Sequence, residues 1–137
     1  MKKYYFLLLA FCLTAMANAQ CPEAGTVVPT AKIMNASSAK EYTDCDVTIE
    51  ASFIFSSVSG YKHPGTFKKS VVFQVSPIGE EGNYRDARGQ RGLFVAIPKE
   101  GSDAIFELSK GDRLELRGHT YVKYGIVYFV ASSFKAL

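Results

Sequence analysis

The side chains best suited to acid–base chemistry in this 137-residue sequence are two histidines, His63 and His119. His63 stands beside Pro64 in a loop-like segment, and His119 lies near the end of a strand-like one. Neither has a nucleophile or an orienting carboxylate at short spacing. The sequence also contains no G-x-S-x-G, H-E-x-x-H, C-x-x-C, P-loop or G-x-G-x-x-G motif. We therefore expect surface histidines and no enzymatic activity, with an enzyme that uses His119 as the alternative.

Metal-binding residue types are present, but not at the spacing of a known site. Asp44 with Asp46, and Glu80 with Glu81, could offer oxygen ligands to calcium, yet neither pair fits a calcium loop. The cysteines and the two histidines are too far apart in sequence to form a short zinc-ligand motif. We expect neither a metal nor another cofactor.

The first nineteen residues have the three parts of a secretory signal peptide. Lys2 and Lys3 supply the positive start, Tyr4–Leu13 is an apolar run, and Ala17 and Ala19 are the small residues before a cleavage site. The sequence therefore predicts cleavage near Ala19 and a periplasmic or secreted protein.

Two other interpretations of this segment are a membrane anchor and a lipoprotein signal. The apolar run has about ten residues, whereas a bilayer-spanning helix needs about twenty. Lipid attachment at Cys21 would require a small residue before it, and Gln20 stands there. We expect no membrane span after cleavage.

Removal of residues 1–19 changes the charge and the cysteine count. Loss of Lys2 and Lys3 lowers the net charge from +3 to +1, so the whole domain has no strongly basic character. Loss of Cys12 leaves Cys21 and Cys45, which in an oxidising compartment most simply form one disulfide. Two free thiols are the alternative.

The mature chain of about 118 residues is long enough for one domain. Residues 20–45 form a lead-in segment with a possible short helix over Ala31–Tyr42. Residues 46–137 are predicted to be a β-domain, because apolar residues alternate or run together between glycine and proline breakers. The predicted strands are 47–55, 70–76, 93–97, 113–122 and 126–132. A helix is predicted from Ser102, as N-cap, to Gly111.

Residues 40–137 resemble bacterial OB-fold proteins. The resemblance rests on FELSKGDRLELRGHTYVKYGIVYFVASSF (residues 106–134) and on KEYTDCDVTIEASF (residues 40–53). It implies an all-β fold with small α content, a five-stranded OB-fold-like Greek-key barrel with a short helix between strands 3 and 4. Ala51 stands where such sequences often have a glycine that lets the first strand bend. Another small β-barrel or a sandwich is the alternative.

The OB-fold resemblance also implies where a ligand would bind. OB-folds bind on the face of strands 2 and 3, between the loop that joins strands 1 and 2 and the loop that joins strands 4 and 5. Between residues 58 and 91 six lysines and arginines stand against three acids, and aromatic residues lie among them. The implied ligand-binding residues are Tyr61, Lys62, Phe67, Lys68, Tyr84, Arg88, Arg91, Tyr121 and Tyr124. Tyrosines placed for strand packing and cations placed for solubility would explain the same pattern.

The function that follows is a hypothesis with two alternatives. We expect an exported, non-enzymatic OB-fold module that binds a small, sugar-like or anionic ligand, or a partner protein. An envelope protein that pairs through a strand edge is the second possibility. Binding of single-stranded nucleic acid is a third; aromatic rings among cations suit it, but the predicted export counts against it.

Overall fold

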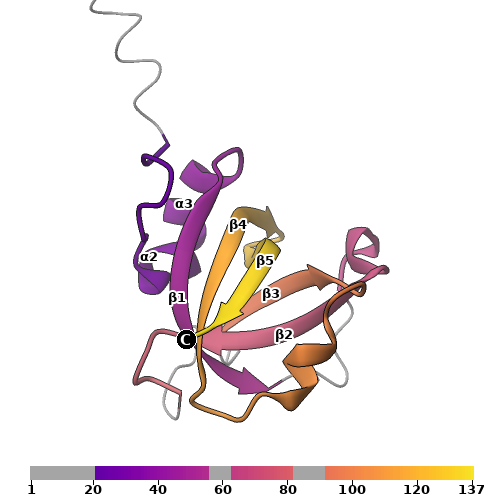
Figure 1. Cartoon of the computed structure of the whole chain (residues 1–137). Helices are drawn as coiled ribbons and strands as arrows, with labels where there is room; N and C mark the ends of the chain where they lie inside the picture. The colour runs from indigo at the N-terminus through magenta and orange to yellow at the C-terminus, as the bar shows by residue number, and fades with distance from the viewer. Residues whose placement is uncertain (1–20, 56–62, 82–91) are drawn as a thin grey trace, which may run out of the picture.

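The computed structural model describes residues 21–55, 63–81 and 92–137. Two short α-helices precede five β-strands, and three 3-10 helices lie between the elements (Figure 1). In chain order these elements are α2 (Thr30–Met34), α3 (Ala36–Ala39), η1 (Lys40–Tyr42), β1 (Val47–Phe55), η2 (Gly65–Phe67), β2 (Ser70–Ser76), β3 (Leu93–Pro98), η3 (Asp103–Glu107), β4 (Arg113–Lys123) and β5 (Ile126–Ala136). The five strands predicted from the hydrophobic pattern are confirmed.

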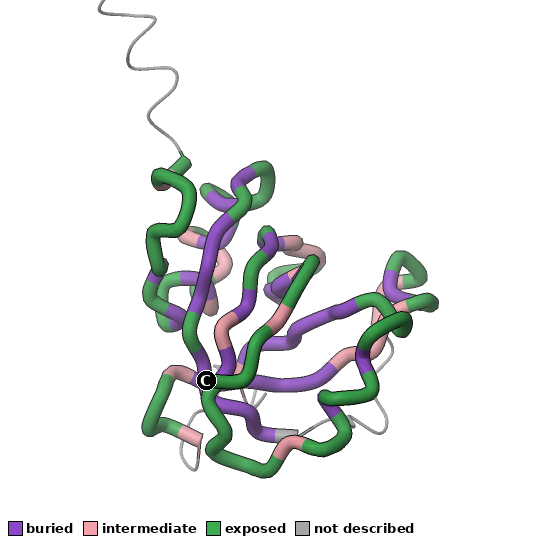
Figure 2. The backbone as a smooth tube through the Cα atoms, in the orientation of Figure 1, coloured by how far each residue is buried: buried purple, intermediate pink, exposed green. Residues whose placement is uncertain are grey.

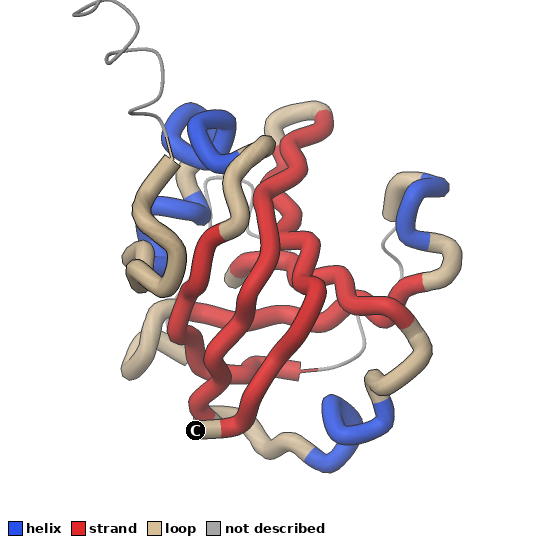
Figure 3. Tube along the Cα trace, turned by 45° about the horizontal axis from the view of Figure 1, so that its top comes forward, coloured by secondary structure: helices blue, strands red, loops and turns tan. Residues whose placement is uncertain are grey.

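The strands close into a barrel in the order β1-β2-β3-β5-β4, and β4 returns to β1. All neighbouring pairs are antiparallel except β3 and β5, which run parallel. A five-stranded Greek-key barrel with this order is the OB-fold, so the predicted fold class is confirmed. In Figure 3 the helical segments lie around the outside of these strands.

Alternation along the strands divides the barrel into an inner and an outer face. The inner side chains form the main core, in which Ile49, Phe73 and Phe129 are fully buried. Figure 2 shows that the buried residues follow the strands. A second, smaller cluster contains Phe94 and Tyr128, which alternate with core residues and therefore lie on the outer face.

The prediction of an α-helix between strands 3 and 4 is wrong. That connection holds only η3, a five-residue 3-10 helix, and the α-helices precede β1 instead. Ser102 does not cap a helix, because its hydroxyl donates a hydrogen bond back to the carbonyl of Lys99. Gly101 and Gly111, both with positive φ, also bracket a segment too short to propagate a helix. Ile105 of η3 still reaches the core.

The lead-in segment packs onto the half of β1 that β2 leaves open. β2 pairs with β1 only from Ser52 onward, so the earlier residues of β1 have a free edge. The amide of Val28 donates to the carbonyl of Thr48 at 2.8 Å, and the Thr30 hydroxyl donates to the carbonyl of Glu50 at 2.7 Å. Backbone groups that would otherwise be unpaired are thus satisfied by the lead-in.

The lead-in also contributes to the core and is covalently tied to the barrel. Ile33, Ala39 and Tyr42 are buried in the main core, and the hydroxyl of Thr120 on β4 donates to the carbonyl of Ala39. Asn35 ends α2 and caps α3, since its side chain accepts hydrogen bonds from two following amides. Cys21 and Cys45 lie at disulfide distance, with Cα atoms 5.5 Å apart, in agreement with the predicted pair.

Two irregularities allow the strands to coil around the barrel. The β1–β2 register shifts between Phe53 and Phe55, so a bulge provides the bend expected of a glycine at the position of Ala51. The β4–β5 register shifts between Arg117 and Gly118. A Cβ atom at Gly118 would lie 2.0 Å from the carbonyl oxygen of Val130, so only glycine permits this close approach.

Candidate binding surface

The loop between β1 and β2 is L12 (residues 56–69), and the turn between β4 and β5 is L45 (residues 124–125). The described part of L12, residues 63–69, lies next to L45, since His63 and Pro64 line the same hollow as Tyr124. We call the surface between them the L12–L45 surface; its residues are His63, Phe67, Tyr121, Lys123, Tyr124 and Tyr128. A hollow of about 130 Å³ opens here, lined by His63, Pro64, Lys123, Tyr124, Ile126 and Tyr128. No carboxylate is among these lining residues, and one cation is.

Stacked aromatic rings anchor the described end of L12 to the outer face of the barrel. Pro64 begins a 3-10 turn that directs Phe67 inward, where its ring lies 4.9 Å from Tyr128 and 5.5 Å from Tyr121. Phe94 on β3 also stacks on Tyr128, with centroids 5.4 Å apart. Phe67, Phe94 and Tyr128 are buried, so they form the base of the surface and their faces are not open to a ligand.

His63 completes the wall of the hollow. Its ring meets Phe94 and Tyr128 edge-on, at centroid distances of 5.4 and 5.8 Å. Its Nδ1 atom lies 3.3 Å from the Tyr128 hydroxyl. Burial among these rings lowers the pKa of His63 below its ordinary value. The neutral imidazole is therefore favoured at neutral pH, where it offers a hydrogen-bonding atom without charge.

Tyr124 projects from the tip of the β4–β5 hairpin. Tyr124 and Gly125 both have positive φ, 52° and 75°, as in a two-residue turn whose twist matches that of the strands. The Tyr124 ring is 84% exposed, and the Nζ atom of Lys123 lies 5.5 Å from its centroid. The hairpin thus presents one aromatic ring and one cation together at the rim of the hollow.

Four of the nine residues implied by the sequence are described, and all four lie on or beside this surface. Tyr121 is half-buried against Phe67, Tyr124 is exposed, and Lys68 directly follows η2 as an exposed cation. Phe67 is placed here too, as a buried anchor. The other five, Tyr61, Lys62, Tyr84, Arg88 and Arg91, lie outside the described residues.

Phe94 and Tyr128 were not predicted from the sequence to contribute to this surface, and His63 was predicted only to be a surface residue. Both aromatics stand in almost continuously apolar segments, LFVAI and IVYFVAS, in which the outward positions are hard to distinguish from the inward ones. Counting alternate positions from Val95 and Phe129, which are core residues, would have placed both on the outer face.

One buried polar group accompanies the aromatic cluster on the outer face. Gln74 on β2 pairs with Phe94 on β3 in the ladder and is buried. Its Oε1 atom has no hydrogen-bond partner. An unpaired buried carbonyl is unfavourable, so a donor supplied to this face would be stabilised.

The described residues hold no group of three or more histidine, cysteine or acidic side chains placed to bind a metal. No helix among them is long and apolar enough to cross a membrane.

Comparisons with known proteins give likenesses among solved structures. No protein-family model matches the sequence, and no curated protein matches it. Among solved structures, the S. pombe Stn1–Ten1 complex is similar over 67% of this chain, with 18% identity and a TM-score of 0.45. The match spans 57% of the length of that chain. The assignment to the OB-fold rests on the strand order and pairing described above.

Proposed function

We propose that this protein is a non-enzymatic OB-fold binding module and that its ligand contacts the L12–L45 surface. The observation that carries the proposal is the exposed Tyr124 ring beside Lys123, at the rim of a hollow whose described lining residues include no acid. The turn places Tyr124 at the tip of the hairpin and leaves its ring exposed. An exposed aromatic ring contributes little to the stability of the fold, so its position at the tip of the hairpin favours a role in ligand binding.

The ligand class best matched by this surface is single-stranded nucleic acid. Tyrosine faces stack on bases, and cations such as Lys68 and Lys123 neutralise phosphates. The cationic excess between residues 58 and 91 adds to this preference.

A sugar-like ligand is the second candidate, and the predicted signal peptide favours it. An exported protein meets glycans more often than it meets single-stranded DNA, and a tyrosine face stacks on a sugar ring as well. The two candidates differ in charge, so the salt dependence of binding separates them.

The test is binding of the purified protein to a labelled oligo-dT of about 12 nucleotides and to a glycan panel, at low and moderate salt. Tyr124→Ala should weaken binding about 5- to 100-fold, since one base–aromatic stack is lost. Lys123→Gln should reduce the slope of log affinity against log salt by about one for DNA, and should leave a neutral glycan unaffected.

Phe106→Ala is the matched control, because Phe106 is the exposed aromatic of η3 and does not contribute to the L12–L45 surface. It should leave the affinity unchanged. If both alanine variants weaken binding equally, or if the protein binds neither probe, the L12–L45 surface is not the ligand site.

A further inference from the structure

A second opening lies where β3 and β5 separate. The two strands pair over only three residues each, Phe94–Ala96 with Tyr128–Val130. β3 continues to Pro98 and β5 to Ala136, and Figure 1 shows the two strands diverging. The barrel therefore has a wedge-shaped opening in its wall beyond this short parallel ladder.

The β5 side of this opening is an unpaired strand edge. Residues 131–136 pair with β4 on one side, and in the part of the chain that the structure describes no strand pairs with them on the other. Ser132, Ser133 and Lys135 are exposed, and Figure 2 shows the end of the chain as exposed. Backbone amides and carbonyls along such an edge are free to accept another strand.

The β3 side cannot accept a strand in the same way. Only Ile97 and Pro98 remain beyond the ladder, and proline has no amide hydrogen to donate. An incoming chain would therefore pair with β5 and merely pack against β3.

A cleft of about 590 Å³ lies at this opening, and its lining extends across β5 to Gly118 and His119 of β4 and to residues 43–46 of the lead-in. Ser70, Ala96 and Pro98 line it on one side, and Val130, Ala131 and Ser132 on the other. Small or apolar side chains make up most of these walls. The cleft can therefore hold the side chains of an added strand as well as its backbone.

We infer that this cleft binds an extended peptide segment of another protein, which adds to the free edge of β5 as a strand. This inference is independent of the L12–L45 surface. A second copy of this chain fits less well, because its own β5 is paired with β4 along its whole length. The β4–β5 pair of a second copy is wider than a single extended chain, and the cleft wall that contains Ser70 and Pro98 would block its approach.

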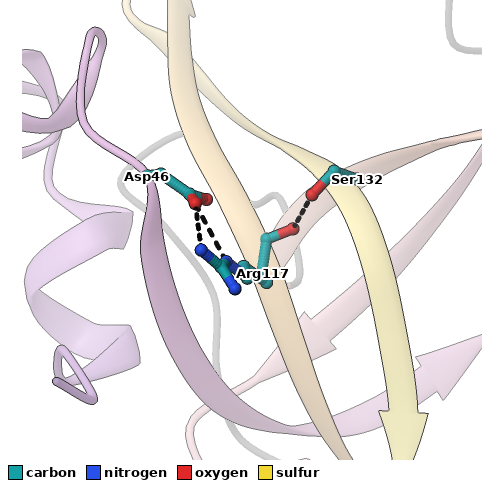
Figure 4. Close-up of polar contacts among 3 residues, drawn as sticks. All are labelled: Asp46, Arg117 and Ser132. Atoms are coloured by element: carbon teal, nitrogen blue, oxygen red, sulfur yellow. Dashed lines mark hydrogen bonds and ion pairs between the residues drawn. The ribbon is translucent and has the colours of Figure 1, made fainter. Parts of the chain in front are cut away.

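Charge at one end of the cleft favours a basic residue in the peptide. Asp44 and Asp46 both line the cleft beside Val130 and Ser132. Asp46 is engaged, since its carboxylate accepts two hydrogen bonds from Arg117, while Ser132 donates to the Arg117 carbonyl (Figure 4). The carboxylate of Asp44 is exposed and can interact with a ligand. A peptide antiparallel to β5 would bring its C-terminal end to this carboxylate.

The test uses a synthetic eight-residue peptide of alternating valine and threonine that ends in lysine, titrated into the purified protein. We expect saturable binding, with amide shift changes and slowed hydrogen exchange confined to residues 130–136 and to the cleft walls. The same peptide with alternate backbone amides N-methylated should bind at least about tenfold more weakly, because it cannot form the ladder.

Asp44→Lys should weaken binding of the lysine-ended peptide about two- to fivefold and strengthen binding of a glutamate-ended one. Glu107→Lys is the matched control, with the same charge change on η3 outside the cleft lining, and should alter neither. Equal binding of the methylated peptide, or shifts centred on the L12–L45 surface, would overturn the inference. So would concentration-dependent dimers that protect residues 131–136 without peptide, since they would make a second copy the occupant.

Discussion

Gly118 is the residue on which the coiling of β4 around β5 depends most directly. A Cβ atom there would come within 2.0 Å of the Val130 carbonyl oxygen and 2.8 Å of the Ala131 Cα atom, both backbone atoms of β5. Gly118→Ala should therefore lower the free energy of unfolding by about 2–3 kcal/mol, because the two strands must move apart. Urea unfolding measures the change.

Gly65→Ala is the control for that variant. A Cβ atom at Gly65 meets only the end of the flexible Lys68 side chain, at 3.8 Å. Its effect should stay within about 0.5 kcal/mol. Equal destabilisation by both variants would mean that the approach at Gly118 does not limit the fold.

His63 should make the L12–L45 surface sensitive to mild acid. Burial lowers its pKa below the ordinary value of 6.5, so the unfolded chain binds a proton at His63 before the folded protein does. The stability contributed by neutral His63 is thus complete above pH 6.5, and it is lost as the pH falls through the lowered pKa. Thermal unfolding followed from about pH 7 to 5 should show this loss, and His63→Gln should remove it.

The response of Glu81 falls in a separate pH window. The Ser52 hydroxyl and the amide of Gly79 lower the pKa of Glu81 below 4.5, and the Gly79 amide donates to its Oε1 atom at 3.0 Å. Its contribution is present above pH 4.5 and is lost only below that value. A loss above pH 5 that persists in His63→Gln would rule out His63 as its source.

At the scale of elements, the lead-in segment behaves as part of the barrel. It satisfies the free edge of β1, fills the core with Ile33 and Tyr42, and is tied down at Cys45. Replacing Cys21 with serine and Cys45 with alanine should lower the free energy of unfolding by about 3 kcal/mol, given a loop of 24 residues. Chemical denaturation of the variant and of the reduced protein measures it.

The same variant also tests how the lead-in is held. Hydrogen exchange at Val28 should become faster while the amides of β3 stay protected, because Val28 depends on a single bond to Thr48. Unchanged exchange at Val28 would show that packing of Ile33 alone holds the segment.

The strands were predictable because a period of two and bounding glycine or proline residues are local signals. The absence of an α-helix between β3 and β4 was not predictable, because Ser102 had two possible hydrogen-bonding roles and its bond to the Lys99 carbonyl prevailed. The packing of the lead-in against β1 was equally hidden, since it depends on where β2 stops. Local sequence patterns specify helices and strands. How far two distant strands pair decides which strand edges are left unpaired, and this cannot be read from a local pattern.

At the scale of the whole molecule, the predicted signal peptide makes export of a shortened chain the expected outcome. Intact-mass measurement of protein from the periplasm or the medium should show a chain that begins at Gln20, since Ala17 and Ala19 precede the cleavage site. Ala19→Arg should block processing and leave the full-length chain. Unprocessed wild-type protein in the cytoplasm would contradict the signal-peptide interpretation.

The binding surface was only partly predictable for a reason that belongs to this scale. The resemblance to OB-folds indicated the two loops; Tyr121 packs on Phe67, and Tyr124 lies at the tip of the β4–β5 hairpin. It could not show that Phe67 is buried, because its burial depends on Tyr128, far away in sequence. The cleft between β3 and β5 has no local sequence signal at all, since it arises from the length of one parallel ladder.

The strand order also determines when each strand can pair as the chain is synthesised. β1 can pair with β4 only after residues 113–118 have emerged. β3 can pair with β5 only when the β4–β5 hairpin is complete. The cysteine pair, by contrast, closes within the first 45 residues, before any strand has a partner. A chain that emerges N-terminus first would therefore form its disulfide early and complete its barrel last. Until residue 137 is released, β1–β3 would remain an open sheet with unpaired edges, the interval in which the protein most needs protection from aggregation.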